Sequence, residues 1–153
     1  MIRFALWCCV FPAVLGPLLP AAPGAPPDFN YFVQNVAPIF LRERSGGARC
    51  YNCHSLESNE SKLHLQPLPP SGHWSEADLR KNYESVLRVI DRSDPLNSRL
   101  LRHPLAREAG GDRFHTGGKF WTSRDDPEWR AIKAWIEGAK APAEKQAAGS
   151  AQP

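Results

Sequence analysis

The sequence predicts an all-α fold, a single small helical domain with long loops. Apolar residues recur at helical spacing in three segments, residues 28–42, 75–90 and 125–138. No segment keeps the alternation of apolar and polar residues that a half-buried strand requires. The chain has 153 residues, enough for one compact domain and too few for two. Its formal charge of +3, with basic and acidic residues interspersed, gives no reason to expect a nucleic-acid partner.

Residues 1–25 have the layout of a secretory signal peptide. A positive start precedes an uncharged apolar run from Phe4 to Pro20, and small residues with prolines follow. The run is short for a spanning helix, which needs roughly 20 apolar residues, and it contains prolines. We therefore expect an exported, periplasmic protein, anchored to a membrane only if this segment is retained. Cleavage removes Cys8 and Cys9 and leaves two cysteines and no methionine.

The first two predicted helices precede and follow the cysteine pair. The first spans Asp28–Arg42, and Pro38 inside it is expected to kink or shorten it. Residues 45–49 form a flexible, glycine-containing connection. The second begins at Ser75, because a serine followed by an acidic first turn is a capping signal, and its apolar stripe continues to Ile90.

Two further helices complete the prediction. Asp94, followed by a proline, opens a short helix that Pro104 stops. Either Asp125 or Asp126 caps the last helix, and Gly138 ends it. The segments expected to lack regular structure are a polar loop at 55–74, a glycine-rich loop at 109–123 and a disordered tail at 141–153. The domain itself is therefore assigned to residues 26–140.

Cys50 and Cys53 are separated by two residues and followed at once by His54, in the sequence CYNCH. Two thiols at this spacing can reach the two vinyl groups of one porphyrin, and the adjacent histidine then lies under the iron as its proximal ligand. Export favours this interpretation, because c-type haem is attached outside the cytoplasm. The motif therefore predicts one covalent haem c.

Other uses of the cysteine pair stay open. A structural zinc site needs four ligands, and His103 and His115 are spaced more widely than the histidines of a zinc finger. A thiol–disulfide enzyme carries such a pair at a helix start in a βαβ setting, and no strands are predicted here. A plain disulfide between Cys50 and Cys53, in an exported binding module without haem, needs neither condition.

Three stretches carry a resemblance to a known family: FVQNVAPIFLRERSGGARCYNCHS, NYESVLRVIDRSDPLNSRLLRHPL and HTGGKFWTSRDDPEWRAIKAWI. In this order they resemble the parts of a class I cytochrome c, and more closely the c-type cytochrome domains common in planctomycetes and acidobacteria. The resemblance covers Phe29 to Lys140. It implies helices wrapped around one covalent haem c, a small exported electron carrier, and a crossing of the first and last helices. Where the family often has a glycine at this crossing, the chain has Val36 and Ala37.

The sixth iron ligand cannot be the methionine of most class I cytochromes, because the mature chain has none. Histidine is the expected substitute. His115 is our choice, since it lies in HTGGKFW, where the resemblance places the distal loop, and its glycines permit close approach of the backbone. His103 is the alternative, and His64 and His73 are expected to be solvated. The aromatic residues that could wall the pocket are Phe114, Phe120 and Trp121.

The resulting functional hypothesis is a monomeric, bis-histidine, one-electron carrier between exported or membrane-bound redox proteins, and not an enzyme. Two histidine ligands predict a lower reduction potential than a histidine–methionine pair. One alternative is a haem sensor or peroxidase-like protein with an open sixth position. Another is the disulfide-containing binding module without haem. The side chains that could neutralise haem propionates are Arg99, Arg102, Arg107 and Arg113.

Overall fold

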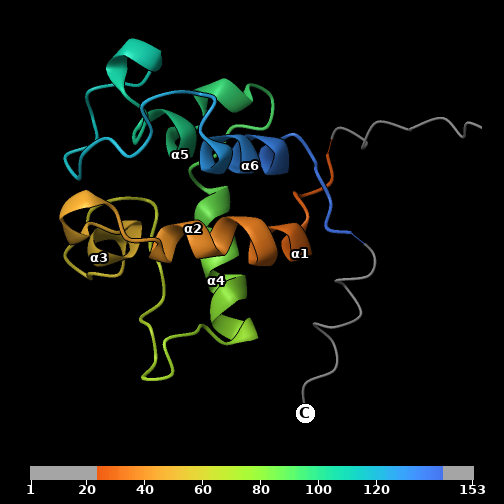
Figure 1. The fold of residues 1–153 in the computed structure, drawn as a ribbon. Helices are drawn as coiled ribbons and strands as arrows, with labels where there is room; N and C mark the ends of the chain where they lie inside the picture. Colours follow the sequence, from red (N-terminus) through yellow and green to blue (C-terminus); the bar gives the residue numbers. More distant parts are fainter. Residues whose placement is uncertain (1–23, 143–153) are drawn as a thin grey trace, which may run out of the picture.

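The computed structural model describes residues 24–142, which form an all-α domain (Figure 1). Within this range the β-type pairing is an isolated parallel bridge between Leu105 and Trp121. No helix of the described part is long and apolar enough to cross a membrane. The signal peptide expected at residues 1–25 and the tail expected at 141–153 fall almost entirely outside the described residues, although Ala141 is buried.

The first helix is continuous from α1 (Phe29–Tyr31) through a π-helical turn, η1 (Phe32–Val36), to α2 (Ala37–Leu41). The π turn gives a physical reason for the tolerance of Pro38. In a regular α-helix the proline ring clashes with the carbonyl four residues earlier. Here the N–H of Ala37 donates to the carbonyl of Phe32, five residues back, so the helix is widened just before the proline. The structure thus has a local widening of the helix where a kink or a shortening was expected.

The segment that carries the cysteines and the second long helix follow. η2 (Ser45–Gly47) leads to α3 (Cys50–His54), and an irregular segment then leads to α4 (Glu76–Leu87). The side chain of Ser75 accepts a hydrogen bond from the N–H of Asp78 at 3.1 Å, which confirms the predicted cap.

The short helix expected from Asp94 is divided in two. η3 (Pro95–Asn97) is separated from α5 (Arg99–Arg102) by Ser98, whose ψ of 126° is not helical. Asp94 does not cap a backbone N–H; its carboxylate accepts from the side chain of Asn97 at 2.6 Å. The hydroxyl of Ser98 instead accepts from the N–H of Asp91 at 2.8 Å, so a local polar turn competes with the helix.

The last helix begins as expected. η4 (Arg107–Ala109) precedes the glycine-rich loop, and α6 (Pro127–Ile136) follows it. Of the two candidate caps, Asp126 accepts from the N–H of Glu128 at 2.9 Å. Gly138, just beyond the helix, has a φ of +102°, a conformation that favours glycine.

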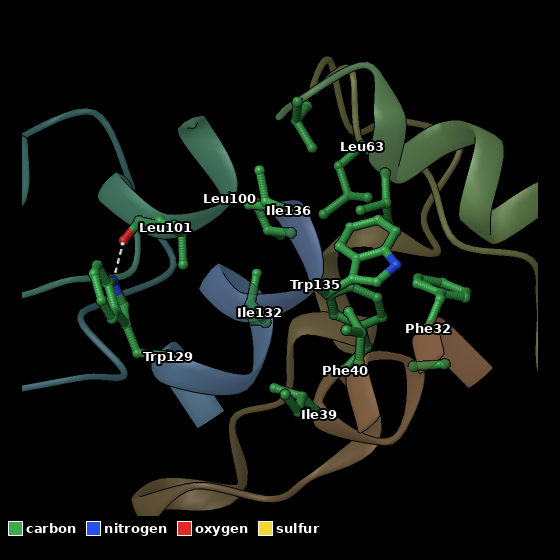
Figure 2. Packing of buried hydrophobic residues seen from close by; sticks show 14 of the residues in the cluster. Phe32, Ile39, Phe40, Leu63, Leu100, Leu101, Trp129, Ile132, Trp135 and Ile136 are labelled. Carbon is green, nitrogen blue, oxygen red and sulfur yellow. Dashed lines mark hydrogen bonds between the residues drawn. The ribbon is translucent and has the colours of Figure 1, made fainter. Parts of the chain in front are cut away.

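The core forms where α6 packs on the first helix, with α4 crossing it (Figures 1 and 2). The rings of Phe32 and Trp135 are fully buried with centroids 5.4 Å apart, and Tyr83 of α4 lies 5.4 Å from Phe32. The indole of Trp135 also donates to the carbonyl of Asp28 at 2.8 Å. On the other side of α6, Trp129 donates to the carbonyl of Leu101 at 3.2 Å (Figure 2). The helices that the resemblance expects to meet are thus in contact.

Candidate functional site

CYNCH forms the single short helix α3, so Cys50 and Cys53, three residues apart, share one side of it. Both are free thiols. Cys53 is exposed, whereas Cys50 is half-buried against the core. Burial raises the pKa of the Cys50 thiol to about 11, although the nearby guanidinium of Arg44 opposes the shift. The two thiols are therefore chemically unequal in the protein without a cofactor.

His54 is held by the segment that follows it. Its Nδ1 lies 3.0 Å from the carbonyl oxygen of Leu63. Since a carbonyl only accepts, Nδ1 carries the proton and the lone pair of Nε2 is left for another partner. Burial lowers the pKa of His54, while the bond to Leu63 opposes the shift. The site thus favours the neutral imidazole, the form that binds a metal.

His115 has the same arrangement in the glycine-rich loop. Its Nδ1 lies 2.6 Å from the carbonyl oxygen of Gly118, which again leaves Nε2 for another partner. Burial lowers its pKa, and the bond to Gly118 opposes this. A Cβ atom on Gly117 would lie 3.1 Å from Cε1 of the imidazole, so the glycine lets the loop fold closely over the ring.

The two imidazoles lie on one cleft with a volume of about 650 Å³, a size ordinary for a cofactor site. Their ring centres are 6.4 Å apart and their planes differ by 11°. Two histidine nitrogens on opposite sides of one metal ion, each bonded at about 2.0 Å, put the ring centres about 6 Å apart. The observed spacing therefore fits one metal ion held between His54 and His115. Cys53 also lines the cleft; Cys50 is not among its lining residues.

His103 lines the same cleft but has a strong partner of its own. Its Nδ1 lies 2.6 Å from a carboxylate oxygen of Asp112. Lys119 donates to the carbonyl of His103 at 2.6 Å and also to that of Asp112, which ties the loop to α5. The structure thus brings both candidate distal histidines to the site. The other two candidates, His64 and His73, are exposed and do not line it.

The glycine-rich loop is also supported by residues that sequence reasoning missed. Arg44 lies 5.4 Å from the ring centre of Phe120, and that ring meets His115 edge-to-face at 5.8 Å. Arg44 in turn pairs with the buried carboxylate of Glu128. No sequence signal identifies this pair, because an acidic residue in a first helical turn is ordinarily exposed.

The three aromatic residues considered for the pocket wall differ in position. Phe114 lines the cleft and is 68% exposed. Phe120 contacts His115 directly. Trp121 does not line the cleft; it is buried, and its indole donates to Glu128 at 3.1 Å. Of the three aromatic residues considered for the pocket wall, only Phe114 therefore lines the cleft itself.

The rest of the lining mixes apolar, cationic and uncharged polar side chains with one carboxylate, that of Glu60. Of the four arginines considered for haem propionates, Arg99 lines the cleft, and Lys62, which sequence reasoning did not single out, lines it too. Among the described residues no three or more His, Cys, Asp or Glu side chains are grouped to hold a bare metal ion. A haem iron, in contrast, takes only its two axial ligands from the protein.

No family model, curated protein or solved structure matches the chain.

Proposed function

We propose that the chain is a monohaem c-type cytochrome that carries one electron at a time between exported or membrane-bound redox proteins. One haem c would be bound to Cys50 and Cys53 by thioether bonds, with His54 as proximal and His115 as distal ligand. The observation that carries this proposal is the pair of nearly parallel imidazoles on one cleft, 6.4 Å apart, one of them in a CxxCH motif.

The hydrogen bonds of the two histidines support this assignment. Each Nδ1 is engaged by a backbone carbonyl, which fixes the ring and directs metal binding to Nε2. The lowered pKa of each imidazole keeps it neutral at pH 7. Bound haem supplies the ferric–ferrous couple. With two histidines on the iron no position is open to a substrate, which favours a carrier over an enzyme and a lower potential than a histidine–methionine pair gives.

The lining of the cleft is compatible with the rest of a porphyrin. Leu63, Val89 and Leu100 offer apolar contact to a flat ring. Lys62 and Arg99 offer positive charge to its two carboxylates. Cys53 is exposed at the cleft, whereas Cys50 would have to give up core contact to react. Export, and membrane attachment only if the leader is retained, follow from the sequence and belong to the same proposal, as does a monomeric state.

The experiment is absorption spectroscopy of the mature protein, made in cells with a working haem-attachment machinery. We expect a six-coordinate, low-spin spectrum in both oxidation states for the wild type and for His103→Ala. His115→Ala should be high-spin and should bind carbon monoxide without delay. A low-spin His115→Ala together with a high-spin His103→Ala would transfer the distal role to His103.

The pair of His103 and Asp112 favours a second candidate, a haem sensor or peroxidase-like protein. A histidine bonded to a carboxylate at 2.6 Å can accept and return a proton, and this one lies on the same cleft. This function requires that His115 leave the iron open. A high-spin ferric wild type that binds carbon monoxide at once would support it and would contradict the carrier.

A further inference from the structure

Residues 63–66 form a strap that is fastened to α4 along one edge. The N–H of His64 donates to the hydroxyl of Ser85 at 2.7 Å, and the N–H of Gln66 donates to the side-chain oxygen of Asn82 at 2.7 Å. Asn82 and Ser85 are both buried and, being three residues apart, share one face of the helix. Two hydrogen bonds thus set the register of the strap.

The other edge of the strap holds the proximal histidine. The carbonyl of Leu63 meets Nδ1 of His54 at 3.0 Å, and the N–H of Leu65 donates to the carbonyl of His54 at 2.8 Å. In an extended segment successive residues present their polar backbone groups to opposite sides. This explains why residues 64 and 66 bond to α4 while residues 63 and 65 bond to α3.

We propose that Asn82 and Ser85 are positioning residues for the proximal ligand, which fix the strap so that the Leu63 carbonyl meets His54. A slip of one residue would turn that carbonyl to the opposite edge. Neither residue lines the cleft, so both act only through the strap. The effect on the iron rests on the proposed function, whereas the effect on the imidazole does not.

The chemistry of Asn82 supports this role. A buried polar side chain is costly unless it is hydrogen-bonded. Its oxygen accepts from the strap, but its Nδ2 has no hydrogen-bond partner among the described residues. An apolar side chain of similar size would remove that unpaired donor. The amide at this position is therefore explained by the hydrogen bond that its oxygen accepts from Gln66, and not by packing.

A hydrogen bond from Nδ1 raises the basicity of a metal-bound histidine, and losing such a partner typically costs 10- to 100-fold in affinity or activity. A more basic ligand favours ferric over ferrous iron. A tenfold loss of this preference raises a one-electron potential by about 59 mV. Releasing the strap should therefore raise the potential of the haem protein.

The test compares Ser85→Ala and Asn82→Ala with Val86→Ala, a control on the same helix whose side chain is fully buried. All three should weaken resistance to urea. Only the first two should raise the reduction potential, by about 59 mV for each tenfold change in relative affinity. A potential that moves equally in all three variants, or in none, would overturn the proposal.

A second measurement does not need haem. Nitrogen-15 NMR of the haem-free protein should find His54 with its proton on Nδ1 in the wild type and in Val86→Ala. In Ser85→Ala and Asn82→Ala a share of the proton should move to Nε2. If no variant carries haem, the proposed function fails, and this tautomer alone decides the role of Ser85 and Asn82. An unchanged tautomer in both variants would refute the positioning role of Ser85 and Asn82.

Discussion

Replacing Glu128 with alanine should be among the most destabilising single changes in this domain. Its carboxylate is 8% exposed and pairs with Arg44, whose side chain is 16% exposed. Removing one partner of a buried pair leaves an uncompensated charge and costs about 3–5 kcal/mol. The indole N–H of Trp121, bonded to the same carboxylate at 3.1 Å, also loses its acceptor. We therefore expect a loss of about 3–5 kcal/mol in the free energy of unfolding.

The two arginines that meet this carboxylate provide a matched comparison. Arg42 lies 2.8 Å from it but is 61% exposed, so its removal should cost only about 0–1 kcal/mol. Arg44→Ala should cost more than Arg42→Ala, because it breaks the buried pair, and less than Glu128→Ala, because Trp121 and Arg42 keep their carboxylate partner. Urea denaturation followed by circular dichroism measures all three. Equal, small losses for the two arginine variants would show that burial does not set the strength of this interaction.

Three further predictions concern the protein without haem. At pH 8, iodoacetamide should modify Cys53 well before Cys50, because raising the pKa of Cys50 from 9.0 to about 11 leaves about 100-fold less thiolate; equal rates by peptide mass mapping would contradict this. The lowered pKa values of His54 and His115 make the folded state prefer neutral rings, so the free energy of unfolding should fall as the pH drops below about 6.5. Urea midpoints measured across this pH range test the prediction. His115→Gln should flatten the dependence of the midpoint on pH. Gly111→Ala should lower the melting temperature by several degrees, since its Cβ would lie 1.9 Å from a backbone carbonyl oxygen; an unchanged melting curve would refute this.

Local signals in the sequence predicted the helix starts well. A capping side chain bonds an N–H only a few residues away, so Ser75 and Asp126 can be identified without tertiary information. The break at Ser98 was not predicted, because its hydroxyl bonds back to Asp91 in a turn that competes with the helix.

The residues of the candidate site could be predicted from the sequence, but the residues that hold them in place could not. Cys53, His54, His103 and His115 were all candidates, and they line one cleft. Their supports come from residues distant in the sequence, such as Arg44 with Glu128, 84 positions apart. No periodicity or motif encodes such a contact, because it exists only once the helices have packed.

The half-buried state of Cys50 is a tertiary effect of the same kind. Its spacing from Cys53 predicts equal access to a porphyrin, whereas packing of α3 against the core makes the two thiols unequal. This difference depends on what α3 packs against, which the motif does not specify.

The mass of the intact mature protein, made alongside a haem-attachment machinery and measured after denaturation, tests the central claim most directly. The account predicts a chain heavier by one haem, with both Cys50 and Cys53 blocked against alkylation. A colourless protein with the mass of the bare polypeptide and two thiols open to alkylation would contradict it.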